Sequence, residues 1–136
     1  FFNVSDYEIA IKKQNSDNKS NLTSEAFVKV IVEGRDIESR GRGNGPVNAL
    51  DKALRSGLGI YDDHLKDLVL VDYKVRILNG GTEAITRVVI ESTDKDGNSW
   101  FTVGVSPNIV EASLKALMDS IQYKLIKDNA PLPKKY

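Results

Sequence analysis

Three glycines alternate in the stretch Arg-Gly-Arg-Gly-Asn-Gly-Pro, and a run with helical spacing follows them directly. They are Gly41, Gly43 and Gly45, and Pro46 comes next. Glycines before a helix suit a phosphate-binding loop, a tight turn or a carboxylate site, because they let an anion approach backbone N–H groups. The residues around the glycines distinguish these three possibilities.

The surrounding residues disfavour a nucleotide-binding loop. A P-loop ends in Gly-Lys followed by Ser or Thr, whereas this stretch ends in Gly45-Pro46-Val47. A dinucleotide fingerprint needs G-x-G-x-x-G in a βαβ unit, whereas the spacing here is G-x-G-x-G-P between hairpin-like strands. Two interpretations remain open. The first is a strand-to-helix turn that needs positive φ angles, and the second is a site where a small carboxylate meets the helix N-terminus.

The other reactive side chains form no catalytic or metal-binding pattern. His64 is the only histidine, and a lone histidine beside aspartates in a polar stretch is most often solvated. The chain has no cysteine and no Gly-x-Ser-x-Gly elbow, which argues against thiolate sites and a hydrolase triad. We therefore predict no catalytic residue and no metal ligand in this chain.

Composition narrows the possible partners. The 136 residues carry 19 lysines and arginines against 19 aspartates and glutamates. The chain therefore lacks the net positive charge that would attract nucleic acid or an anionic membrane. No apolar run approaches the roughly 20 residues of a membrane span. We expect no nucleic-acid or membrane partner. The lack of cysteine is compatible with a reducing compartment, and we expect a cytoplasmic location.

An internal repeat organises the chain. Residues 4–11 resemble residues 70–77 in sequence, and residues 25–34 resemble residues 83–92, with apolar side chains at alternate positions as in β-strands. A third strand and a helix follow in each half, the strands within 35–43 and 93–104 and the helices within 45–57 and 106–125.

The expected fold class is therefore α+β, with two pseudo-symmetric βββα repeats, antiparallel sheets and one helix in each repeat. The repeats span about residues 3–57 and 69–125 of a single domain over residues 1–136. Residues 12–24 are predicted as a polar loop and residues 126–136 as a tail.

Both helices show start signals and an apolar stripe. Val47, Leu50 and Leu54 recur at helical spacing in the first helix. Pro46 and its counterpart Pro107 suit a first helical turn, where the missing N–H group is no loss. Ser106 is the predicted N-cap of the second helix.

Four ordered motifs resemble a known family. They are GNGPVNALDKAL, DYKVRIL, GTEAITRVVIES and WFTVGVSPNIVEASLKALMDSIQYKL, and together they cover nearly the whole chain. They resemble the C-terminal regulatory domain of 2-isopropylmalate synthase and (R)-citramalate synthase. The resemblance implies homodimerisation and binding of an end product, leucine in the first enzyme and isoleucine in the second. It also implies an upstream catalytic TIM barrel that uses a divalent metal and acetyl-CoA, with no cofactor in this domain.

The resemblance also implies an effector site. The helix starts face the polar end of the amino acid, Asp51 attracts its ammonium group, and one strand of the second repeat holds its side chain. The implied residues are Asn44, Gly45, Pro46, Leu50, Asp51, Leu70, Tyr73, Ile77, Thr82, Thr86, Pro107 and Asn108.

Alternatives remain for several of these residues. Leu70 and Ile77 are equally compatible with an ordinary core, and Asp51 with a solvated surface. A purely structural dimerisation domain is the alternative to an effector-binding one. The last motif is closer to the citramalate branch of the family, which favours isoleucine over leucine.

Overall fold

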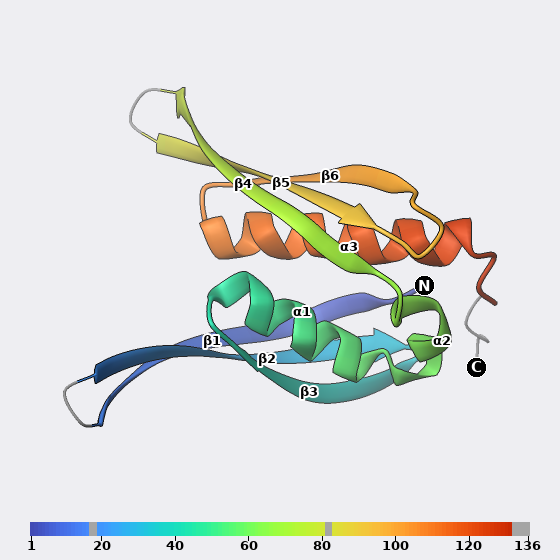
Figure 1. The fold of residues 1–136 in the computed structure, drawn as a ribbon, viewed down its shortest axis with the longest axis horizontal. Coiled ribbons are helices and arrows are strands. Elements are labelled where there is room, and N and C mark those ends of the chain that lie inside the picture. Colours follow the sequence, from blue (N-terminus) through green and yellow to red (C-terminus); the bar gives the residue numbers. More distant parts are fainter. Residues whose placement is uncertain (17–18, 81–82, 132–136) are drawn as a thin grey trace. The chain divides into compact units, whose positions relative to one another are not determined.

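The fold consists of two consecutive βββα repeats, each an antiparallel three-stranded sheet with a helix (Figure 1). This computed structural model describes residues 1–16, 19–80 and 83–131. The predicted α+β class and antiparallel sheets are confirmed. The first repeat contains β1 (Asn3–Ser16), β2 (Lys19–Val32), β3 (Arg35–Gly43) and α1 (Pro46–Gly57). The second contains β4 (Val69–Gly80), β5 (Glu83–Thr93), β6 (Ser99–Ser106) and α3 (Ile109–Lys127).

Two compact units divide the chain near the connector between the repeats. Unit 1 includes residues 1–62, and unit 2 consists of residues 63–130. The connector contains a turn of 3-10 helix (Gly59–Tyr61) and the short helix α2 (Asp62–Leu65). Each unit contains one predicted repeat with its own sheet, whereas the single domain over 1–136 stays a prediction.

Unit 1 is held together by α1, which packs on the sheet face that we call the inner face. The alternation of β2 turns every second side chain toward the helix, and α1 contributes its apolar stripe. A Cβ at Gly41 would lie 2.4 Å from the backbone oxygen of Ala49, so the helix rests directly on the backbone of β3. The buried side chains are Ala26, Val28, Val30 and Val32 of β2 and Ala49, Leu50, Ala53 and Leu54 of α1.

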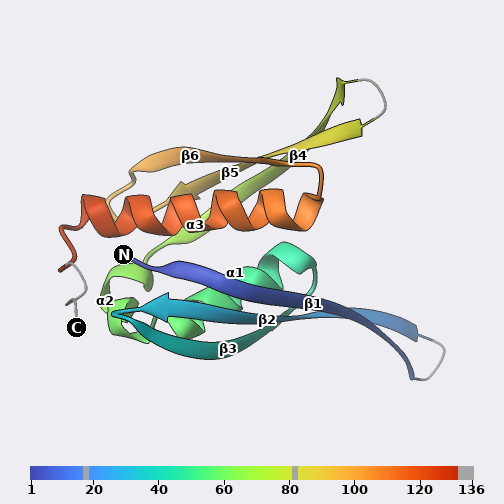
Figure 2. The same cartoon turned by 180° about the vertical axis from the view of Figure 1, so that it is seen from behind.

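Unit 2 repeats this packing with a longer helix. Figure 2 shows α3 lying along its sheet, where it packs on β5 and β6. A Cβ at Gly104 would lie 1.8 Å from the backbone oxygen of Ala112, so this helix also meets a bare strand. The Oγ atoms of Ser92 and Ser120 lie 2.6 Å apart in the interior and satisfy each other. The main apolar core residues are Val88 and Ile90 of β5 and Ala112, Ala116, Leu117 and Ile121 of α3.

The first hairpin is longer than predicted. β1 continues to Ser16 and β2 begins at Lys19, with backbone pairing throughout, so the loop prediction for residues 12–24 is wrong. That prediction took polar composition as evidence against strands, whereas a ladder needs only backbone N–H and C=O groups. The predicted tail is also too long, because α3 ends at Lys127. Residues 17–18 and 132–136 lie outside the described residues.

Candidate functional site

The chain passes from β3 to α1 through Gly41, Gly43 and Gly45. The reason that glycine is needed there differs from the predicted one. Among the described residues, the glycines with positive φ are Gly34 and Gly97, so the positive-φ interpretation of the glycine run is wrong. Gly41 and Gly43 are instead needed for close approach, since a Cβ at Gly43 would lie 2.2 Å from Asn48 Oδ1. Gly45 is extended, with φ −151° and ψ 170°, and a Cβ added there would meet no atom within 4 Å.

The start of α1 is open to an acceptor from outside the helix. Gly45 is its N-cap residue and offers no side-chain acceptor, and Pro46 follows at the first helical position. No acidic residue lies in the first turn. Because the first N–H groups of a helix have no intrahelical partner and the helix dipole favours negative charge, this geometry suits a small carboxylate. Asn44 is exposed beside it.

The start of α3 differs, because its own side chains cap it. Asn108 Oδ1 accepts hydrogen bonds from the backbone N–H groups of Val110 at 2.8 Å and Glu111 at 3.2 Å. The predicted N-cap, Ser106, is therefore wrong, and Pro107 precedes the helix instead of opening it. Ser106 Oγ accepts from the Asn108 backbone and donates to the Glu111 carboxylate. Glu111 also places a negative charge in the first turn of this helix, which disfavours a second carboxylate there.

The residues predicted to hold the side chain of the effector lie on the inner face of β4, the face of this sheet on which α3 packs. Tyr73 is paired with Ile90 and Ile77 with Thr86, so these side chains share the face that carries α3. Leu70 is on the same face and half-buried. Since α3 packs on β5 and β6, the inner face of β4 is left partly open, and Ile77 is 68% exposed.

Polar groups border this apolar strip. Tyr73 Oη and Ser113 Oγ of α3 lie 2.9 Å apart and form a hydrogen bond, and Thr86 is buried at the edge of the strip. Val75 lies between Tyr73 and Ile77 on the same face and is also exposed, although it is not among the predicted residues. The period of two along the strand was enough to find Val75, whereas Ser113 is placed by tertiary packing alone.

Two predicted residues of unit 1 are already engaged. Leu50 is fully buried in the core between α1 and its sheet. The carboxylate of Asp51 accepts from Arg55 Nε at 3.0 and 3.1 Å, and both side chains are mostly buried. Burial raises the pKa of Asp51, while Arg55 acts against this shift. Attraction of a ligand ammonium group by Asp51 therefore competes with Arg55.

The predicted site residues fall in both units. Unit 2 brings together Leu70, Tyr73, Ile77 and Thr86 on one face, and Thr82 lies outside the described residues. Pro107 and Asn108 are exposed before α3. Unit 1 contains the others, which are Asn44, Gly45, Pro46, Leu50 and Asp51. Their assignment to an effector site stays a prediction.

A network of ion pairs at the C-terminal end of α3 was not predicted from the sequence. Lys124 is buried and pairs with Asp67 at 3.2 Å and with Asp128. His64, predicted to be solvated, lies with Nδ1 3.4 Å from Asp128 and is half-buried. Lys127 pairs with Asp94 of the turn before β6. The contacts of Lys124 with Asp67, His64 with Asp128 and Lys127 with Asp94 join segments far apart in the sequence, so they hold unit 2 together.

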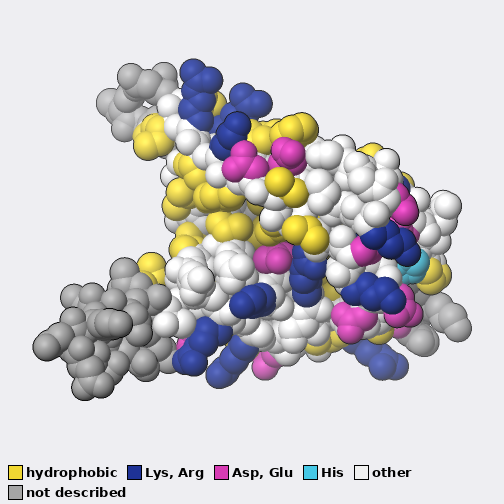
Figure 3. Space-filling view, viewed as in Figure 1, with side chains coloured by type: hydrophobic (Ala, Val, Ile, Leu, Met, Phe, Trp, Pro, Cys, Tyr) yellow, Lys and Arg dark blue, Asp and Glu magenta, His cyan; other side chains and the backbone are white. Residues whose placement is uncertain are grey.

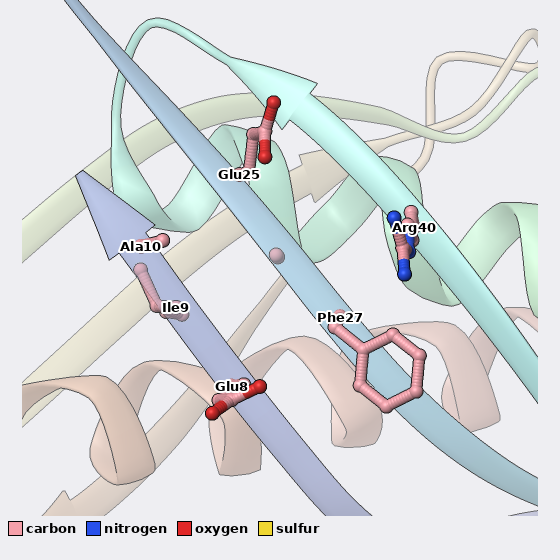
Figure 4. Close-up of a pocket in the computed structure, with 7 residues that line it drawn as sticks. Glu8, Ile9, Ala10, Glu25, Phe27 and Arg40 are labelled. Atoms are coloured by element: carbon pink, nitrogen blue, oxygen red, sulfur yellow. The ribbon is translucent and has the colours of Figure 1, made fainter. Parts of the chain in front are cut away.

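A shallow hollow of about 380 Å³ lies over the strands of unit 1 (Figure 4). Arg40 lies over the ring of Phe27, 5.7 Å from its centre, and Arg42 Nη2 donates to Glu25 Oε1 at 2.7 Å. Of the charged residues that line the hollow, Arg40 and Glu25 thus interact with neighbours on the sheet surface. The lining residues are Glu8, Ile9, Ala10, Glu25, Ala26, Phe27 and Arg40, and none is a predicted effector contact.

Metal ligands and membrane-spanning helices were also considered. Within residues 1–16, 19–80 and 83–131, no group of three or more histidine, cysteine, aspartate or glutamate side chains is placed to hold a metal ion. No helix in this described part of the chain is long and apolar enough to cross a membrane.

Comparison with known proteins gives consistent relatives. The chain is 50% identical over 130 residues to an (R)-citramalate synthase of Aquifex aeolicus, covering 94% of this chain and 24% of the relative. It is 48% identical over 129 residues to an (R)-citramalate synthase of Geobacter sulfurreducens, covering 93% and 24%. It is 31% identical over 130 residues to a 2-isopropylmalate synthase of Aquifex aeolicus, covering 93% and 23%.

These relatives are named as synthases, and the chain spans about a quarter of their length. A family model described as the LeuA allosteric (dimerisation) domain matches residues 2–125. This match includes both βββα repeats and most of α3. The chain therefore belongs to the LeuA allosteric (dimerisation) domain family.

Proposed function

We propose that this chain is the end-product-sensing and dimerisation domain of a synthase that condenses acetyl-CoA with a 2-oxo acid in branched-chain amino-acid biosynthesis. The proposed effector is isoleucine or leucine, bound for feedback inhibition. Family membership and the names of the relatives support this role. Acetyl-CoA, divalent metal and catalysis then belong to the remainder of a longer, cytoplasmic protein, and this chain needs no cofactor.

The open inner face of β4 is the observation that carries the proposal. It presents aliphatic side chains beside two hydroxyl groups, those of Tyr73 and Ser113. An aliphatic amino-acid side chain gains free energy by covering such a surface, at about 25 cal/mol per Å² of apolar area. Among the hydrophobic residues of this strand that α3 leaves uncovered, Ile77 is the most exposed, at 68%.

The polar end of an amino acid needs a separate partner. In unit 1 the uncapped start of α1 offers backbone N–H groups to a carboxylate without a competing acidic residue. The capped start of α3 is a poorer candidate because Asn108 already satisfies two of its N–H groups. Of the two helix starts, each considered within its own unit, the start of α1 is therefore the better suited to a carboxylate.

Isoleucine is the preferred effector in this proposal. The two (R)-citramalate synthases match the chain at about 50% identity, against 31% for the 2-isopropylmalate synthase. Leucine and isoleucine differ by the position of one methyl group, and such a difference changes binding by about 1–3 kcal/mol. We expect a preference of roughly 10- to 200-fold at most, not exclusion.

Calorimetric titration tests the proposal. We expect the 136-residue chain to bind isoleucine more tightly than leucine or valine, and Ile77→Ala to weaken that binding at least about fivefold through lost apolar contact. Ile126→Ala is the matched control, because Ile126 is 63% exposed near the C-terminal end of α3. Its affinity for isoleucine should be unchanged.

Each other outcome has a definite meaning. Absence of binding to all three amino acids would leave the structural dimerisation domain as the function. Tighter binding of leucine would overturn the isoleucine preference. Equal loss in Ile77→Ala and Ile126→Ala would remove the β4 surface as the site.

A further inference from the structure

β6 differs from the other three edge strands of the two sheets. Its residues 99–106 read Ser-Trp-Phe-Thr-Val-Gly-Val-Ser and include no charged side chain and no proline. The sheet order β4-β5-β6 leaves β6 at an edge. On its outer face, the side turned away from α3, Phe101 is 66% exposed, and Val103 and Val105 are also exposed.

The repeat provides an internal comparison. Gly41 of β3 and Gly104 of β6 occupy equivalent positions, each under the backbone of its helix. The positions next to Gly41, Arg40 and Arg42, are therefore equivalent to Val103 and Val105 in β6. Both arginines are exposed. The same edge of the same fold is thus charged in unit 1 and apolar in unit 2, so packing against the helix does not require the apolar residues of β6.

The remaining edges carry features that discourage pairing with another chain. β1 has a register shift between Val4 and Asp6, and β4 has one between Leu70 and Asp72. Bulges and charged side chains are common protections of edge strands. The pairing of β6 with β5 instead runs without a shift from Ser99 to Ser106. A regular, uncharged edge of this kind is a template for another strand.

A contact of Lys115 shows which backbone groups of β6 point to the free edge of the sheet. Its Nζ donates to Val105 O at 3.3 Å, so this carbonyl points away from β5. N–H and C=O groups alternate sides along an antiparallel strand, so Phe101 and Val103 present theirs to the same edge. Lys115 is exposed and can leave this carbonyl to a stronger partner.

We propose that β6 pairs with β6 of a second copy, antiparallel across a twofold axis at Val103, so that the sheets of the two unit 2 copies become continuous. This inference rests on the dimerisation part of the proposed function and names its surface. With the axis at Val103, Phe101 of each copy lies opposite Val105 of the other. The exposed apolar residues of both strands then form one continuous stripe.

Charge favours edge pairing over face-to-face packing. The outer face of the same sheet carries charged side chains of both signs, the basic Lys74, Arg76 and Arg87 and the acidic Asp72 and Glu91. Figure 3 shows lysine and arginine side chains beside the hydrophobic ones in this part of the molecule. Packing two such faces on each other would take these charged groups out of water, which costs free energy. Edge pairing keeps them at least one strand away from the axis.

Mass and dissociation measurements test the surface. We expect sedimentation equilibrium to give wild type twice the chain mass of 15.0 kDa. Val103→Lys places two lysines opposite each other and should raise the dimer dissociation constant at least about tenfold. Ile60→Lys, on the connector and 58% exposed, is the matched control and should leave it unchanged. Circular dichroism confirms that each variant folds.

A single cysteine provides an independent test, because the chain has none of its own. Directly opposed residues in such a pair have Cα atoms about 5.5 Å apart, which suits a disulfide. We expect Val103→Cys to form a cross-linked dimer under mild oxidation, and Arg40→Cys, at the equivalent position of β3, to form none. A wild-type monomer would overturn both dimerisation and this surface. A wild-type dimer that Val103→Lys leaves intact, with no cross-link in Val103→Cys, would overturn the surface alone.

Discussion

Gly104 leaves no room for a side chain where α3 crosses β6. A Cβ there would lie 1.8 Å from the backbone oxygen of Ala112, and a helix backbone cannot rotate away as a side chain does. Overpacking of this kind costs about 1–3 kcal/mol, and occasionally more. We expect Gly104→Ala to lower the free energy of unfolding by at least about 2 kcal/mol in a urea titration.

Gly59→Ala is the control for this prediction. No atom lies within 4 Å of a Cβ at Gly59, and its φ is not in the left-handed region. We expect a change of less than about 1 kcal/mol. Equal free energies of unfolding for Gly104→Ala and wild type would contradict the close approach.

The glycines before α1 show what can and what cannot be predicted from the sequence at single residues. The alternating glycines correctly indicated a strand-to-helix corner before Pro46. They did not reveal why glycine is needed, because spacing does not say which backbone atom approaches which position. The structure shows that Gly41 and Gly43 have helix atoms against them, whereas Gly45 faces open space.

At the scale of elements, Asp94 connects the turn before β6 to the end of α3. Its carboxylate accepts from Lys127 and from the backbone N–H groups of Asp96 and Asn98. The hydrogen bond from Lys127 is the main cause that holds the pKa of Asp94 well below its usual range. Asp94 in turn raises the pKa of Lys127.

This pair predicts a pH dependence of stability. A carboxylate whose pKa is lowered by folding stabilises the native state above its unfolded pKa of about 3.9, and this stabilisation is lost as pH falls further. The raised pKa of Lys127 contributes below about pH 10.4 and is lost above it. We expect the free energy of unfolding, measured in urea, to fall below about pH 4 and above about pH 10.

Asp94→Asn separates this pair from the other carboxylates. The difference in unfolding free energy between wild type and Asp94→Asn should shrink as pH falls from about 5 to 2. Asp96→Asn, exposed in the same turn, should follow the wild-type pH curve more closely. A constant difference between wild type and Asp94→Asn would contradict the linkage.

Secondary structure was predictable where the pattern was local. The period of two located the apolar parts of the strands but not the polar ends of β1 and β2. Proline with helical spacing located α1 to within a residue. The N-cap of α3 was misplaced from Asn108 to Ser106, because both residues are good caps and only the hydrogen bonds distinguish them. The pair between Asp94 and Lys127 joins residues 33 apart, which no local pattern reports.

At the scale of the whole molecule, effector binding should appear as a gain in stability. A ligand that binds only the folded chain stabilises it by about 2.7 kcal/mol when its free concentration is 100 times the dissociation constant. We expect the melting temperature to rise by several degrees with isoleucine, less with leucine and not at all with glycine. Differential scanning calorimetry measures this shift. An equal shift with glycine would contradict recognition of the side chain.

The candidate site was predictable only in part. The family resemblance named Leu70, Tyr73 and Ile77, and the register of β4 places them on one face. Leu50 was named as well but is buried in the core of unit 1, since an apolar residue on an amphipathic helix has the same sequence signature in a pocket and in a core.

Trp100 gives unit 2 an optical signal of its own. It is the only tryptophan in the chain, and its buried ring lies 5.0 Å from the ring of Tyr123. Indole emission depends on the polarity of its surroundings. Fluorescence excited selectively at tryptophan therefore reports on the interior of unit 2 and gives no signal from unit 1. Comparing that emission with far-ultraviolet circular dichroism during denaturation reveals whether the two halves of this duplicated sequence melt as one or in turn.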